Sequence, residues 1–104
     1  MGGRVKEMTD KLTISVTGRV TMVGYRAFVA KKAQKLQLTG WIRNVKENFF
    51  FLRGEVDAYF EGDKATLEQI LAECKKGPTG SGVRQIKVKW TRGKKVFESF
   101  EVLR

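Results

Sequence analysis

The stretch Gly18-Arg19-Val20-Thr21-Met22-Val23-Gly24-Tyr25-Arg26 decides how the rest of the chain is arranged. It follows a run from Leu12 to Thr17 in which apolar and polar residues alternate, and it precedes a segment whose apolar residues recur at helical spacing. We therefore expect a junction between a strand and a helix. At such a junction, backbone N–H groups lack intrahelical partners and point outward from the helix N-terminus.

Arg26 falls in the first turn of the expected helix, which is an unfavourable place for a cation. A helix N-terminus carries a partial positive charge, which repels a guanidinium at the same place. An anion bound between the helix end and the guanidinium would remove this repulsion. One interpretation is a phosphate cradle, in which loop N–H groups and the bidentate fork of Arg26 hold the anion together. The alternative is an ordinary loop with a solvated arginine, and the spacing leaves both open.

The same residues resemble the phosphate-binding loop of the acylphosphatases, which is written Gly-x-Val-Gln-Gly-Val-x-Phe-Arg. The residues in register with it are Gly18, Val20, Val23 and Arg26. Tyr25 replaces the phenylalanine of the pattern. The chain departs from it at Thr21, where the family has glutamine, and at Met22, where the family has glycine. If that glycine has a positive φ, Met22 costs about 1 kcal/mol or more in strain.

A second signature of this family is an aromatic residue after glycine, followed by asparagine and later by Gly-x-Val-x5-Gly. The residues that match it are Gly40, Trp41, Asn44, Gly54, Val56 and Gly62. The family usually has a spacer of three residues after the asparagine, whereas Val45 to Arg53 makes nine here. Gly77-Pro78, Phe97 and Phe100 also match, so the resemblance extends from about Leu12 to Val102.

The resemblance implies hydrolysis of small acyl phosphates to a carboxylate and inorganic phosphate, without a metal or another cofactor. It implies that Arg26 and Asn44 are catalytic, Arg26 by binding the phosphate and Asn44 by positioning the attacking water. It assigns further phosphate binding, mainly through the backbone, to Val20, Thr21, Met22, Val23, Gly24 and Tyr25. Considered without the family, Asn44 would equally fit a turn at a strand end. We expect that the long spacer after Asn44 can displace its side-chain amide.

Composition restricts the chemistry further. The 104 residues include 21 lysines and arginines, 11 aspartates and glutamates, and no histidine, which gives a net charge of +10. Without histidine, Ser-His-Asp and Cys-His catalysis are excluded. The resemblance to the acylphosphatases implies that the attacking water loses its proton to the substrate's own phosphate, and the absence of histidine is consistent with that. One cysteine without histidine cannot build a structural zinc site.

The positive charge also supports a rival function. A surplus of cations attracts small phosphorylated metabolites, nucleic acid or anionic membranes. The rival is a non-catalytic module of the same fold that binds RNA or another polyanion. It is not favoured, because no segment matches the aromatic-rich motif of ferredoxin-like RNA-binding domains.

Cys74 could in principle be a phosphatase nucleophile. That chemistry needs an arginine six residues later, where Gly80 stands. Cys74 also continues the helical apolar stripe of Leu67, Ile70 and Leu71. The sequence therefore predicts a buried structural thiol.

The order of the expected elements predicts the fold. Strands are expected at Lys11–Thr17, at a segment entered through Leu38–Asn44, at Gly54–Phe60, Val83–Trp90 and Val96–Val102, and helices at Tyr25–Gln37 and from Asp63 to Lys76. Thr91–Lys95 is predicted as a turn. This order is typical of an α+β, ferredoxin-like split-βαβ sandwich, with an antiparallel sheet of four to five strands and two helices on one face. Residues 1–10 are expected to form a flexible basic arm before a single domain at residues 11–104.

Three segments have alternative interpretations. Trp41 is predicted to pack in the core beside the first helix, although a stacking platform for a base is conceivable. The apolar run Asn48–Leu52 predicts an extended hairpin; the alternative is an exposed patch through which Phe49–Phe51 would form a weak dimer of an otherwise monomeric protein. The segment Gly77–Gly82 predicts a flexible connection and not a nucleotide-binding loop.

No apolar run approaches 18 residues, and the N-terminus lacks the apolar centre of a signal peptide. We therefore expect no membrane association and a cytoplasmic protein.

Overall fold

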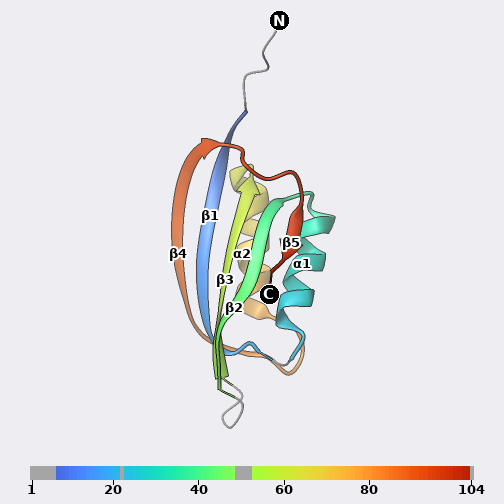
Figure 1. The fold of residues 1–104 in the computed structure, drawn as a ribbon, viewed down its shortest axis with the longest axis vertical. Helices are drawn as coiled ribbons and strands as arrows, with labels where there is room; N and C mark the ends of the chain where they lie inside the picture. The colour runs from blue at the N-terminus through green and yellow to red at the C-terminus, as the bar shows by residue number, and fades with distance from the viewer. Residues whose placement is uncertain (1–6, 22, 49–52, 104) are drawn as a thin grey trace, which may run out of the picture.

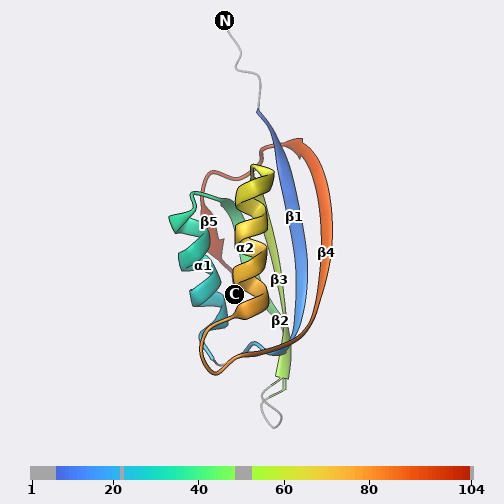
Figure 2. The same cartoon turned by 180° about the vertical axis from the view of Figure 1, so that it is seen from behind.

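The computed structural model of the chain describes residues 7–21, 23–48 and 53–103. Its elements are β1 (Met8–Arg19), α1 (Tyr25–Lys35), β2 (Thr39–Asn48), β3 (Arg53–Gly62), α2 (Lys64–Lys76), β4 (Gly82–Lys94) and β5 (Phe100–Val102). The strands form one sheet in the order β4-β1-β3-β2-β5, and both helices cover the same face of it (Figures 1 and 2). This confirms the predicted ferredoxin-like α+β fold.

The sheet is mixed only at one edge. The pairs β1–β3, β1–β4 and β2–β3 are antiparallel, as predicted, whereas the short β5 runs parallel to β2. β5 is three residues long and is preceded by irregular chain, so the final strand predicted at Val96–Val102 begins later than expected.

The core lies between the sheet and the helices. Alternation along β1 and β3 places one apolar row from each strand on the helix side, where every member is at most 1% exposed: Leu12, Ile14, Val16, Val56, Ala58 and Phe60. The helices meet these rows with Val29, Ala33, Leu67, Ile70 and Cys74, which are fully buried. The prediction that the Cys74 thiol is buried is confirmed, and burial raises its pKa to about 12. Neither α1 nor α2 is long and apolar enough to cross a membrane.

Several predicted boundaries were wrong because strand pairing extends further than the alternation of residues. Met8 pairs with Lys94, so β1 begins before Lys11, and the expected turn at Thr91–Lys95 is mostly strand. The arm predicted at residues 1–10 therefore loses Met8–Asp10 to the sheet, and its residues 1–6 lie outside the described part of the chain. α1 ends at Lys35, and Gln37 follows with a positive φ of 60°.

Trp41 does not pack beside α1, and the sequence prediction for it was wrong. Its neighbour Ile42 is fully buried on the helix side, and successive residues of a strand point to opposite faces. Trp41 therefore lies on the face of the sheet that the helices do not cover, which we call the open face. Its ring stacks there on that of its cross-strand partner Tyr59 at a centroid distance of 6.2 Å.

The described parts of the long spacer lengthen the two strands, as an extended hairpin requires. β2 and β3 continue to pair as far as Asn48 and Arg53. The phenylalanines at 49–51 and their proposed dimer contact lie outside the described residues.

Glu61 on β3 forms hydrogen bonds with the connection from β4 to β5. Its side chain is 2% exposed and accepts four hydrogen bonds, from the hydroxyls of Thr39 and Tyr59 and from the backbone N–H groups of Val96 and Phe97. Burial by itself would raise the pKa of this carboxyl, but the four hydrogen bonds outweigh it and hold the pKa below its ordinary value. The charged form of Glu61 therefore stabilises the fold.

We predict that Glu61→Gln lowers the free energy of unfolding by about 2 kcal/mol at pH 7, because an amide cannot accept all four hydrogen bonds. A depressed pKa contributes stability above the unfolded-state pKa, near 4.5, and this contribution is lost as the pH falls through the lower folded-state pKa. Urea unfolding at pH 7 and pH 3 should show the difference between the two proteins shrinking in acid. A difference of equal size at both pH values would contradict this account.

Candidate functional site

The N-terminus of α1 has backbone N–H groups without intrahelical partners and no acidic residue in its first turn. Gly24 precedes the helix in the left-handed conformation, with φ of 76° and ψ of 18°, and its carbonyl accepts the first intrahelical hydrogen bond, from the Phe28 N–H at 3.0 Å. The N–H groups of the first turn, ahead of Phe28, have no acceptor within the helix. No acidic side chain occupies this turn. The positive end of the helix dipole therefore lacks a negative partner of its own.

Arg26 is held beside this helix end by the C-terminal part of the chain. Its Nη1 donates a hydrogen bond to the carbonyl of Leu103 at 3.0 Å. Leu103 is fixed in turn, because its N–H donates to the carbonyl of Ile42 on β2 at 2.8 Å. A guanidinium has five N–H donors in a rigid fork, so one bond orients the group and leaves donors for a ligand.

Asn44 comes from the opposite side of the site, on β2. It lies within the strand rather than at its end, opposite the buried Val56, and therefore faces the helices. A β-bulge follows at once, with Val45 as the extra residue before Lys46 pairs with Glu55. Asn44 itself pairs with Val56 before the bulge, so the register shift begins after it.

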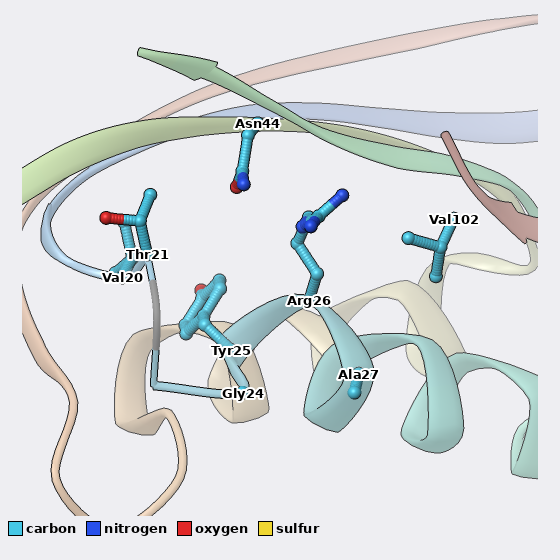
Figure 3. Close-up of a pocket in the computed structure, with 8 residues that line it drawn as sticks. All are labelled: Val20, Thr21, Gly24, Tyr25, Arg26, Ala27, Asn44 and Val102. Atoms are coloured by element: carbon cyan, nitrogen blue, oxygen red, sulfur yellow. The ribbon is translucent and has the colours of Figure 1, made fainter. Parts of the chain in front are cut away.

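These groups meet in one cavity of about 340 Å³ between β2, β5 and the start of α1 (Figure 3). Figure 3 shows Arg26 rising from the helix and Asn44 descending from the strand into the same space. The residues that line it are Val20, Thr21, Gly24, Tyr25, Arg26, Ala27, Asn44 and Val102. The structure thus brings together both residues predicted to be catalytic and four of the predicted loop residues. Val23 instead packs against the core, and Met22 lies outside the described residues.

Two residues of the cavity were missed by sequence reasoning. Ala27 follows Arg26 in the first turn of α1, so helical geometry could have placed it there. Val102 comes from β5, and its place depends on a parallel pairing with Ile42 that no local pattern indicates. Both add apolar atoms to the lining of the cavity.

Tyr25 fixes the start of α1 to the end of α2. The side chain is 1% exposed, and its hydroxyl donates to the carbonyl of Cys74 at 2.7 Å. Burial, followed by the proximity of Cys74, raises the pKa of the phenol well above its ordinary value. The hydroxyl is therefore a structural donor that joins the loop to the second helix.

Comparisons with known proteins point to one family. The family model described as Acylphosphatase matches residues 12–102. The chain belongs to the acylphosphatase family. It is 40% identical over 92 residues to an acylphosphatase of Syntrophotalea carbinolica, covering 88% of this chain and 94% of that protein. It is 38% identical over 99 residues to an acylphosphatase of Methylococcus capsulatus, covering 90% and 96%.

A solved structure shows the same likeness in three dimensions. The crystal structure of acylphosphatase from Bacillus subtilis superposes with a TM-score of 0.79 at 29% identity, covering 91% of this chain and 99% of that one. The resemblance inferred from the two sequence motifs is thereby confirmed as family membership.

Gly24 offers a test of the loop conformation. A Cβ added there would meet nothing within 4 Å, so Gly24→Ala should cost only the backbone strain of its positive φ, about 1–2 kcal/mol of unfolding free energy. Gly24→Asn should cost less, because asparagine tolerates this conformation. Gly82→Ala is the control, since its added Cβ would lie 3.6 Å from the Cβ of Arg19, an ordinary contact, and its φ is not left-handed. Equal stabilities of Gly24→Ala and the wild type in urea would disprove the left-handed junction.

Proposed function

We propose that this member of the acylphosphatase family hydrolyses small acyl phosphates to a carboxylate and inorganic phosphate. The observation that carries the proposal is the convergence of Arg26, Asn44 and the open N-terminus of α1 on one cavity. Each supplies a different requirement of the reaction: a fixed cation, a neutral group that can hold water, and backbone N–H donors.

The phosphate group is held by charge and hydrogen bonds in this proposal. The N–H groups of the first turn and the guanidinium of Arg26 face the same space, so three negatively charged oxygens can be bound from two sides. These donors are in place before the substrate arrives, because Gly24 sets the turn and Leu103 holds the guanidinium. Donors that need no rearrangement lower the barrier as charge builds up on the phosphate oxygens.

Asn44 positions the water. Its amide has a donor and an acceptor that keep their character at neutral pH, and it enters the cavity from the sheet, across from the helix end. The water oxygen forms the new bond to phosphorus as the bond from phosphorus to the acyl oxygen breaks. The carboxylate leaves with the electron pair, and the water's proton passes to the phosphate.

The proposed reaction needs no metal or other cofactor. An acyl phosphate is a mixed anhydride whose carboxylate is a good leaving group, so positioning and electrostatic stabilisation suffice. The acyl group is proposed to lie against the apolar side chain of Val102, which lines the same cavity as Arg26. Small substrates fit this arrangement because the cavity measures about 340 Å³.

The first test is hydrolysis of benzoyl phosphate in the presence of EDTA. Arg26→Ala should lower kcat by about 10²–10³, the usual cost of one charge-stabilising donor, while the folded state remains. Arg43→Ala is the matched control, since it removes an exposed arginine from β2 without touching the cavity, and it should keep full activity. A folded wild type without turnover would instead favour the polyanion-binding module, and turnover that survives Arg26→Ala would refute the assigned site.

Asn44→Ala tests whether Asn44 positions the attacking water. Since the amide holds water and not the anion, kcat should fall by about 10² or more, as expected for lost positioning, while the inhibition constant of inorganic phosphate stays within about twofold. Gln85→Ala, which removes an exposed amide from β4, serves as the control. A variant that loses phosphate affinity but keeps kcat would show that Asn44 binds the anion.

A further inference from the structure

β4 forms one edge of the sheet, and its two faces differ in chemistry. Its pairing with β1 places Ile86, Val88 and Trp90 opposite buried residues, on the helix side. The same register places Lys87 and Lys89 opposite Ser15 and Thr13, on the open side. β4 therefore alternates between apolar and cationic residues along its central part.

The described residues cover the apolar row of β4 only in part: Ile86 packs against the core, and the other two side chains are exposed. Val88 is 39% exposed and Trp90 is 37% exposed, whereas the residues opposite them on β1 are at most 1% exposed. Figure 2 shows the reason: α2 lies over the inner strands, and β4 bows outward beyond it. Of α2, Lys64 at its N-terminus reaches the row, with its ammonium 4.9 Å from the centre of the Trp90 ring.

Positive charge is concentrated on the same strand. The stretch from 75 to 97 contains no acidic residue, and its cations are Lys75, Lys76, Arg84, Lys87, Lys89, Arg92, Lys94 and Lys95. Arg92 forms an ion pair with Asp10 at 3.2 Å. Among the described residues, neither Lys87 nor Lys89 pairs with a carboxylate. Both ammonium groups are therefore available to an acidic partner.

We propose that the outer edge of β4 binds an extended acidic segment of another protein, which adds to the sheet as a sixth strand next to β4. Every second residue of an edge strand directs its N–H and C=O away from the sheet, so β4 has backbone donors and acceptors for such a segment. The proposal concerns residues outside the cavity of Arg26 and Asn44 and goes beyond the hydrolytic function.

The spacing of side chains along β4 determines the sequence pattern that the partner strand needs. Lys87 and Lys89 are two residues apart, or about 6.8 Å along the strand, and an added strand repeats its side chains at the same interval. Acidic residues at alternate positions would face the two lysines. Apolar residues between them would cover Val88 and Trp90 on the other face. The partner is therefore an extended segment in which acidic and apolar residues alternate.

Charge argues against a second copy of this chain at the same edge. Two β4 strands paired with each other would bring the lysine-rich strands together, and like charges on neighbouring strands are destabilising. A single-stranded nucleic acid would satisfy the lysines, but it would leave the outward N–H and C=O groups without a strand partner. The combination of a free edge, alternating cations and an exposed apolar row favours the acidic strand.

The experiment titrates the full chain with an alternating Glu-Val octapeptide and records amide chemical shifts and Trp fluorescence. We expect shifts centred on β4 and slower hydrogen exchange of its outward amides. Binding should weaken at least tenfold for a peptide of the same composition with its glutamates and valines in separate blocks, and for one N-methylated at alternate residues. Equal binding of all three peptides, or no binding of the alternating one at millimolar concentration, would overturn the proposal.

Two double variants distinguish binding at the β4 edge from non-specific attraction by the net positive charge. Lys87→Glu with Lys89→Glu should weaken peptide binding at least tenfold and leave benzoyl phosphate hydrolysis unchanged. Lys31→Glu with Lys35→Glu changes the net charge equally on the exposed part of α1 and should bind the peptide as the wild type does. An oligothymidylate that binds β4 more tightly than the peptide would also refute the proposal, because it would identify a nucleic-acid surface instead.

Discussion

The hydrogen bond from Arg26 to the carbonyl of Leu103 holds the candidate site together. It joins the first turn of α1 to the end of the chain, and Leu103 is bound to Ile42 on β2, two residues from Asn44. Three segments far apart in sequence are thus fixed around one cavity. A cation at a helix N-terminus is unfavourable without an anion. The carbonyl of Leu103 orients the guanidinium beside the helix end, so the anion site that we propose is ordered before a ligand binds.

This arrangement requires β5 to lie beside β2, and Glu61 makes that possible. The chain leaves β4 at one edge of the sheet and reaches the other edge by a connection across the end of the strands (Figure 1). Glu61 binds the N–H groups of Val96 and Phe97 in this connection, and the ring of Phe97 packs edge-on against Tyr59 at 5.5 Å. Polar contacts on the open face therefore determine where the last strand, and with it Leu103, is placed.

The sequence predicted what depends on local patterns. The alternation in Leu12–Val16 and the apolar helical positions up to Cys74 predicted the buried faces. Two motifs pointed to Arg26 and Asn44, which the structure places in one cavity. What depends on pairing between distant strands was not predictable. Trp41 lies on the open face because Ile42 enters the core, β4 continues to Lys94 because Met8 pairs with it, and Val102 reaches the cavity through a parallel pairing with β2. An alternating pattern gives the period of a strand but neither its partner nor its length.

In the proposed mechanism, a water held by Asn44 attacks a phosphorus atom bound by Arg26 and the start of α1. The most direct measurement is hydrolysis of benzoyl phosphate in ¹⁸O-labelled water, with mass analysis of both products. Attack at phosphorus predicts that the label appears in inorganic phosphate and that the benzoate remains unlabelled. Label in the benzoate would mean attack at the carbonyl carbon, for which this cavity has no proposed role, and would contradict the account.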